Sequence, residues 1–136
     1  MAFQGNFTCD VFKSGLLNAD FDFATDTIEI ALYTNSATLN EDTTEYTTTG
    51  EVVASGYTAG GNTLSPTVSI SNNVAFVTFA NTSWSGAFTA RGALIYKAGA
   101  NGAICVLDFG SDKTSVTTFQ VEFPPATFNS ALIRIS

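Results

Sequence analysis

The chain has 136 residues, of which 45% are hydrophobic and only 12% are charged, and its formal net charge is −7. That length suits one domain whose core needs no metal or disulfide. The five basic residues are scattered, whereas nucleic-acid binding needs a clustered basic face, so neither nucleic acid nor an acidic membrane surface is an expected partner. No apolar run approaches the roughly 20 residues of a membrane span, and residues 1–6 lack the pattern of a secretory signal.

The first expected element is a short helix over residues 6–17, whose apolar residues fall on one face. Asn6 or Thr8 is expected to cap its start and Asn18 to end it, while Gly15 weakens its interior. We expect this helix to pack at one edge or end of a sheet.

From residue 27 the apolar period changes from that of a helix to that of a strand. Ile28, Ile30 and Leu32 point one way, and Glu29 and Tyr33 point the other. This alternation predicts a strand that is buried on one face and exposed on the other.

Further short strands are predicted at close spacing, separated by turns rich in Gly, Asn, Asp and Pro. No helical pattern lies among them, so the predicted fold is mostly β, an antiparallel jelly-roll-like β-sandwich of about eight strands in one domain, residues 1–136. The predicted strands cover residues 27–33, 51–53, 68–71, 74–79, 88–96, 103–109, 118–123 and 131–135. The side chains expected to point inward are Ile28, Ile30, Leu32, Phe76, Leu94, Val106, Val121 and Ile133.

Two segments are too long or too Gly-rich for simple turns. Residues 34–49 are mostly polar, and residues 56–62 contain three glycines. Long irregular segments of compact domains are usually functional or disordered, and surface loops carry function more often than strands do. The alternative is a pair of ordinary ordered connections.

The sequence offers little catalytic chemistry. Histidine is absent, which excludes the Ser-His-Asp and Cys-His arrangements, and there is no Gly-rich phosphate loop and no Cys/His cluster for zinc. The carboxylates at residues 20–26 and 41–45 are expected to be solvated turn residues. Asp108-Phe109-Gly110 matches a kinase magnesium motif in letters only, so we expect a strand end there, with a calcium site at Asp108 and Asp112 as the alternative. We therefore expect no enzyme, no cofactor and no metal.

Three further residues carry two interpretations each. Cys9 and Cys105 match no metal spacing and are expected to be buried free thiols, whereas a disulfide would need an oxidising compartment. Trp84 is expected to close one end of the core, and the alternative is an exposed sugar-binding residue.

Several runs of this sequence resemble a family of small tailed-bacteriophage virion proteins. The most specific are Gly-Tyr-Thr-Ala-Gly-Gly at residues 56–61 and Ala-Arg-Gly-Ala-Leu-Ile-Tyr at residues 90–96, and the resemblance covers nearly the whole chain. It also includes Leu16–Asn18, Asp22–Phe23, Ile30–Thr34, Ala37–Leu39, Tyr46–Val52 and Val106–Lys113.

This resemblance implies a jelly-roll cement, or decoration, protein on the outer face of a phage head, made and assembled in the cytoplasm of the host bacterium. Its implied partners are the major capsid protein and itself, as a homotrimer or, alternatively, a homodimer. The other implied role is a tail or fibre-associated module that binds a receptor or sugar. Segments 34–49 and 56–62 are the candidate contact loops, and their candidate contact residues are Glu41, Asp42, Glu45, Tyr46, Tyr57 and Asn62.

Overall fold

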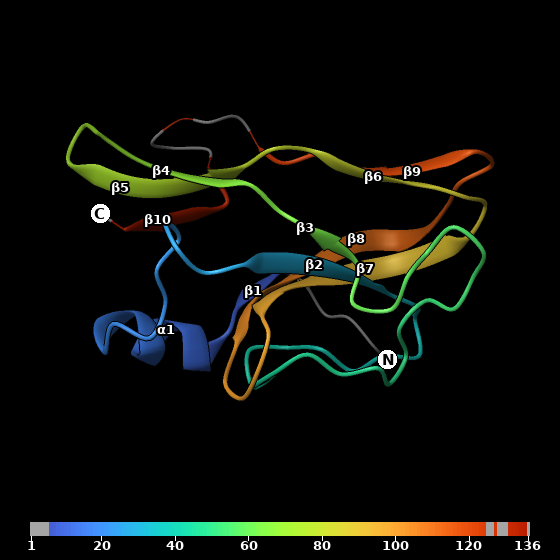
Figure 1. Ribbon diagram of the computed structural model, residues 1–136, viewed down its shortest axis with the longest axis horizontal. Coiled ribbons are helices and arrows are strands. Elements are labelled where there is room, and N and C mark those ends of the chain that lie inside the picture. The colour runs from blue at the N-terminus through green and yellow to red at the C-terminus, as the bar shows by residue number, and fades with distance from the viewer. Residues whose placement is uncertain (1–5, 125–126, 128–130, 136) are drawn as a thin grey trace.

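Ten strands and one helix form the described part of the chain, residues 6–124, 127 and 131–135, in a computed structural model (Figure 1). In chain order they are β1 (Phe7–Thr8), α1 (Asp10–Leu17), β2 (Ile28–Tyr33), β3 (Asn62–Thr63), β4 (Pro66–Ser71), β5 (Val74–Phe79), β6 (Thr82–Ser85), β7 (Thr89–Lys97), β8 (Ala103–Thr114), β9 (Thr118–Val121) and β10 (Ile133–Ile135). They make antiparallel sheets in the orders β1-β8-β7-β2-β3, β10-β5-β4 and β6-β9. This confirms the predicted antiparallel β-sandwich with one short helix.

The five-stranded sheet lies in the middle of the molecule. Ile30 of β2 lies opposite Ile95 of β7, while Leu94 lies between Ala31 of β2 and Val106 of β8. Residues directly opposite each other in antiparallel strands point to the same face. Ile30 and Ile95 therefore share one face of this sheet, and Ala31, Leu94 and Val106 share the other.

Both faces of the central sheet are buried, which corrects the prediction that β2 is half-exposed. Ala31 and Tyr33, on the face expected to meet solvent, are as buried as Ile30 and Leu32. Figure 1 shows the reason: the two smaller sheets lie on one side of the central sheet, and residues 34–61 lie on the other. The sequence could not show this because a polar segment is not expected to cover a sheet.

The three-stranded sheet contains a tight hairpin between β4 and β5. Ser71 pairs with Val74, and the two residues between them, Asn72 and Asn73, have φ angles of 52° and 64°. Two consecutive residues with positive φ make the type I′ turn that suits the twist of a hairpin, and Asn tolerates this conformation. The predicted turn at these two residues is confirmed.

The helix is shorter than the predicted span of residues 6–17. Residues 7 and 8 instead pair with β8, with Phe7 opposite Val106, and α1 begins only at Asp10. Its N-cap is Cys9, which makes no side-chain capping bond, so the predicted cap by Asn6 or Thr8 is wrong, whereas Asn18 ends the helix as predicted. Gly15 fits because a β-carbon there would lie only 2.7 Å from the Phe21 ring.

Other strand boundaries differ from the predicted ones, in part because residues typical of turns lie inside a strand. The predicted turn at residues 110–112 is wrong: β8 continues to Thr114 through a register shift, and Gly110 has a φ of 86° there. Such a bulge inserts extra residues into one strand without ending it. The predicted strand at 51–53 is reduced to a single bridge between Glu51 and Tyr33, and strand β6 was not predicted.

All eight residues predicted to point inward are buried, but they do not share one core. Phe76 lies outside the main cluster, which contains its neighbours Val77 and Phe79 instead. Leu94 and Val106 pack on the opposite face of the central sheet from Ile30. The alternation of apolar residues along each strand predicted which side chains are buried. It did not predict that separate layers cover the two faces of the central sheet.

Gly61 provides a test of how closely the chain approaches the central sheet. Its φ is 80°, and a β-carbon there would collide with the carbonyl oxygen of Ile30. We expect Gly61→Ala to lower the free energy of unfolding by about 3 kcal/mol, measured by urea denaturation. Gly99→Ala is the matched control, because Gly99 has a φ of 105° but nothing within 4 Å, and should cost about 1 kcal/mol. Equal losses in the two variants would contradict the close approach.

Candidate contact surface

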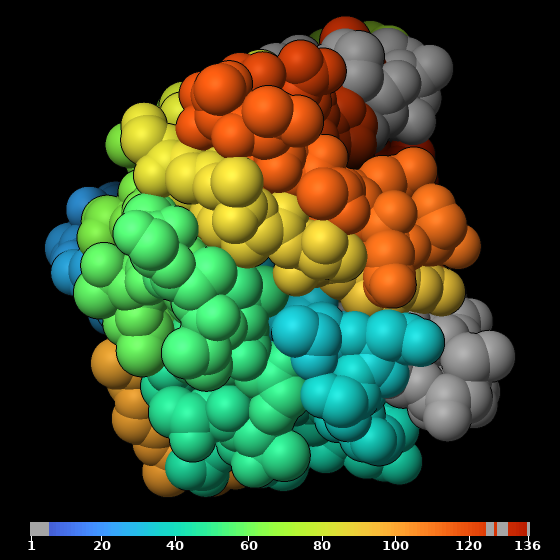
Figure 2. Space-filling model, turned by 90° about the vertical axis from the view of Figure 1, so that its right-hand side faces the viewer, coloured from blue at the N-terminus to red at the C-terminus, as the bar shows by residue number. Residues whose placement is uncertain are grey.

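Residues 34–61 form a layer without helix or sheet that packs on the central sheet. Ala37, Leu39 and Val52 point into the core and are almost completely buried. The backbone N–H of Val52 donates to the carbonyl of Leu32, which ties this layer to β2. Figure 2 shows the segment, coloured cyan to green, as a broad continuous part of the surface. The layer therefore has an anchored inner side and an exposed outer side.

The centre of the anchored side is a buried carboxylate, Glu51, of which only 6% is exposed. Its Oε1 accepts a hydrogen bond of 2.5 Å from the Tyr46 hydroxyl. Its Oε2 accepts from the Tyr57 hydroxyl at 2.6 Å and from the backbone N–H of Gly60 at 2.8 Å. A buried charge is costly unless it is hydrogen-bonded, and these three donors provide that compensation.

The four tyrosines of the chain converge on this carboxylate and join the layer to the sheet. Tyr57 accepts from the backbone N–H of Leu32 at 2.9 Å, so one hydroxyl connects Glu51 to β2. Tyr96 of β7 donates to the carbonyl of Gly60 at 2.6 Å and stacks on Tyr46 with ring centroids 4.8 Å apart. Tyr33 of β2 donates to the carbonyl of Thr47 at 2.6 Å. We call Glu51 and these four residues the tyrosine cluster.

Burial keeps the hydroxyls of the tyrosine cluster protonated. Burial and, after it, the hydrogen-bonded Glu51 carboxylate together raise the pKa of Tyr46 to about 12. Burial also raises the pKa values of Tyr33, Tyr57 and Tyr96 above their usual range. Because these phenols act as neutral donors that are already bonded within the chain, the cluster serves to hold structure.

The sequence did not identify Glu51, which was assigned only to a short strand. One signal was present: Glu51 lies between Gly50 and the apolar pair Val52-Val53, an unusual place for a solvated carboxylate. The sequence did select Tyr46 and Tyr57, as contact residues, and the structure places both in the tyrosine cluster.

The acidic contact candidates lie on the exposed outer side of the layer. Glu41, Asp42 and Glu45 are all exposed and gather around a turn in which the backbone N–H of Asp42 donates to Asn40 at 2.8 Å. The carbonyl of Glu41 accepts from the N–H of Asp10 at the start of α1, at 2.9 Å. We call Glu41, Asp42 and Glu45 the acidic turn, because they form a fixed, negatively charged edge of the layer.

The remaining contact candidates have partners within the chain. Tyr57 is buried and Tyr46 is half-buried, both bonded to Glu51. The side-chain amide of Asn62 donates to the hydroxyl of Thr82 at 2.9 Å and to the carbonyl of Ser83 at 2.8 Å, and so joins β3 to β6. Of the six candidates, the acidic turn is thus the part that faces outward freely.

Two of the acidic residues considered for catalysis or metal binding, Asp26 and Asp108, have partners within the chain. Asp108 forms an ion pair with Arg91 and accepts from the N–H of Gly110 at 2.8 Å. The hydrogen bond that the N–H of Asp22 donates to the Asp26 carboxylate lowers the pKa of Asp26. The nearby Lys97 ammonium lowers it as well. Within residues 6–124, 127 and 131–135, no group of three or more potential metal-binding side chains is found.

The cysteines and the tryptophan are core residues. Cys9 and Cys105 are buried free thiols, as expected, and burial raises the pKa of Cys9 to about 12. Trp84 is also buried and packs against Tyr57 and Phe119, with ring centroids 6.0 Å and 6.4 Å apart. The core interpretation of Trp84 is therefore confirmed, and its indole is not part of an exposed sugar-binding surface.

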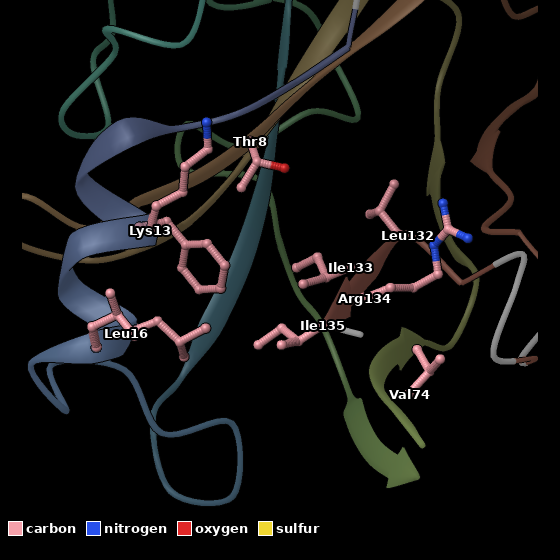
Figure 3. Close-up of a pocket in the computed structure, with 10 residues that line it drawn as sticks. Thr8, Lys13, Leu16, Val74, Leu132, Ile133, Arg134 and Ile135 are labelled. Carbon is pink, nitrogen blue, oxygen red and sulfur yellow. The ribbon is translucent and has the colours of Figure 1, made fainter. Parts of the chain in front are cut away.

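A groove of about 810 Å³ separates α1 from β10 (Figure 3). In the close-up, Ile133 and Ile135 of β10 point toward the helix, while Arg134 points away from it. Lys13 and Leu16 of α1 line the other side. The groove is mainly apolar, and it contains none of the residues that the sequence singled out for chemistry or contact.

Comparison of the chain with protein-family models, with curated proteins and with solved structures finds no match. Within the described residues, no helix has the length and apolar character needed to cross a membrane.

Because the tyrosine cluster keeps its hydroxyls protonated in the fold, we expect the protein to lose stability at high pH. The pKa of Tyr46 rises from 10.0 to about 12 in the fold, so above about pH 10 the unfolded chain loses its phenolic protons before the folded chain does. The free energy of unfolding should therefore be constant near neutral pH and fall as the pH rises through 10. Urea denaturation at about pH 8 to 11 measures this. Tyr57→Phe should reduce the slope of the free energy of unfolding against pH, and an unchanged slope would contradict the contribution of the buried Tyr57 hydroxyl.

Replacing the central carboxylate should loosen the layer from the sheet. In Glu51→Gln an amide N–H₂ takes the place of one acceptor oxygen, so at least one of the donors Tyr46, Tyr57 and Gly60 loses its acceptor. We expect a loss of about 1–3 kcal/mol and faster hydrogen exchange at the Gly60 amide. Glu122→Gln, on an exposed residue of the same type, should change neither quantity.

Proposed function

We propose that this chain is a tailed-phage virion structural protein, a capsid cement protein that binds the outside of the head and stabilises contacts between major capsid protein subunits. The resemblance described above supports this role. The observation that carries it is the layer of residues 34–61, an irregular segment held rigidly on the central sheet with its acidic turn outward.

A cement protein needs a preorganised contact surface more than it needs chemistry. The layer supports such a role because Glu51 and the buried Leu39 and Val52 fix its conformation before any partner is bound. Preorganisation lowers the ordering cost of binding. A protein that binds the assembled shell, but not its dissociated subunits, stabilises the shell by mass action.

The acidic turn is the proposed site of contact with the major capsid protein. Its three carboxylates are exposed, and the turn backbone is fixed by bonds to Asn40 and Asp10. Fixed charges at an interface set the orientation and the rate of association. Each contact is small, but many copies on one shell add their effects through avidity.

The copy number in purified particles tests this role against a tail or fibre role. A cement protein is present in hundreds of copies per particle, a tail component in a handful. Heads that lack the protein should assemble and then release DNA at a lower temperature than complete heads do. A handful of copies located on tails, or heads of unchanged stability, would contradict the cement proposal.

Reversing the charge of the acidic turn should weaken binding to heads. We expect Glu41→Lys/Glu45→Lys to fold normally and to bind purified heads at least tenfold more weakly, in a co-sedimentation titration. The matched control is Asp112→Lys/Glu122→Lys, which makes the same change of net charge at two other exposed positions. Equal weakening in both variants would assign the effect to net charge rather than to the acidic turn.

A further inference from the structure

Strand β4 is an unprotected edge of the three-stranded sheet. It is the last strand in the order β10-β5-β4, and within the described residues only β5 pairs with it. Val68 is 58% exposed and Ile70 is 75% exposed, although both are β-branched residues that usually lie in a core. In Figure 1, β4 lies in the layer farthest from residues 34–61.

The register of the hairpin identifies the backbone groups that are free on this edge. The N–H of Ala80 donates to the carbonyl of Ser65, so these two residues form a hydrogen-bonded pair. Such pairs alternate along an antiparallel ladder, which makes Ser69 with Phe76, and Ser71 with Val74, hydrogen-bonded pairs as well. The type I′ turn at residues 72 and 73 requires the same arrangement.

The backbone groups of Val68 and Ile70 consequently point away from β5. These two residues present two N–H and two C=O groups to the outer edge, and Pro66 adds one carbonyl. Another strand is the partner that satisfies such a row of groups, because its own groups repeat at the same spacing.

The charge distribution favours a second copy of this chain as that partner. Two chains of net charge −7 repel each other wherever their carboxylates meet, as they would at the acidic turn. Between Glu51 and Arg91 the chain has no charged residue, and this stretch includes all of β3, β4, β5 and β6. Two identical chains would therefore bring no charged residues of these strands together if they met at the edge of β4.

The edge also lacks the features that keep edge strands apart. Natural edges usually carry Lys, an internal Pro or a bulge, or are very short. In β4 the only such residue is Pro66, at the first position, and β4 pairs with β5 over all six residues without a register shift. Val68 and Ile70 also share a face with Ile135 of β10, which is 54% exposed, so exposed apolar side chains lie on this face at both edges of the three-stranded sheet.

We propose that two copies of this protein pair through antiparallel β4 strands around a two-fold axis at Ser69. In this register Val68 lies opposite Ile70 of the partner subunit, and each such pair exchanges two backbone hydrogen bonds. The two three-stranded sheets become one six-stranded sheet, β10-β5-β4 continued by its symmetric copy. A two-fold contact uses the same surface on both chains and closes as a dimer, which selects the dimer over the trimer considered from sequence.

This pairing does not depend on the proposed function, because it concerns only the protein in solution. Sedimentation of the full chain at about 100 µM should show a dimer in equilibrium with monomer, since two paired strands form an interface at the small end of the known range. A monomer at that concentration, or a trimer, would overturn the proposal.

Charged substitutions on β4 test whether its edge is the dimer interface. Val68→Lys/Ile70→Lys places lysines opposite each other and should weaken dimerisation at least tenfold, and so should Val68→Glu/Ile70→Glu. An equimolar mixture of the two variants should dimerise again, because opposite charges then face each other. Val53→Lys is the matched control on a valine that is 96% exposed outside the sheets, and it should dimerise like the parent. A dimer unaffected by the β4 variants would overturn the proposal.

Cross-linking tests the register. Two residues at the two-fold axis form a non-hydrogen-bonded pair with Cα atoms about 4.5 Å apart, a distance that a disulfide spans. Ser69→Cys should therefore form a covalent dimer rapidly under mild oxidation. Thr67→Cys should not, because in this register it faces Ser71 of the partner subunit. The parent chain is the control for the buried Cys9 and Cys105. Cross-linking of Thr67→Cys instead of Ser69→Cys would overturn the register.

Discussion

The buried carboxylate of Glu51 is the interaction on which the rest of this structure depends. Residues 34–61 have no helix or extended strand, so apart from single backbone bonds, such as that from Val52 to Leu32, no regular strand pairing holds them on the central sheet. Glu51 replaces that pairing by gathering donors from Tyr46, Tyr57 and Gly60, and Tyr57 in turn binds the backbone of β2. Satisfied networks of this kind rigidify a buried site, whereas partly satisfied ones destabilise it.

The covering layer explains why the central sheet is apolar on both faces. The two smaller sheets bury one face in the usual manner of a sandwich, and residues 34–61 bury the other (Figure 1). Ala31 and Leu94 are fully buried on a face that most antiparallel sandwiches leave to solvent. A segment that reads as a polar loop is thus part of the core, and only its outer side is available for contact.

The two proposed interaction surfaces lie in different layers and differ in charge. The acidic turn belongs to the layer of residues 34–61, and the neutral edge of β4 belongs to the three-stranded sheet (Figure 1). A dimer formed through β4 would leave both acidic turns exposed. Self-association and attachment to a larger assembly are therefore compatible uses of one small domain, because they do not compete for the same residues.

The sequence by itself determined the fold class, the burial of Ile28, Ile30 and Leu32, and the turn at Asn72-Asn73, because alternation and turn chemistry are local properties. The tertiary structure decided what lies over each face. Tyr33 was assigned to solvent and Phe76 to the core by the same alternation, which marks two faces but does not say what covers them. Glu51 shows the limit most clearly, since its buried position depends on Tyr46, Tyr57 and Gly60, and only folding brings them together.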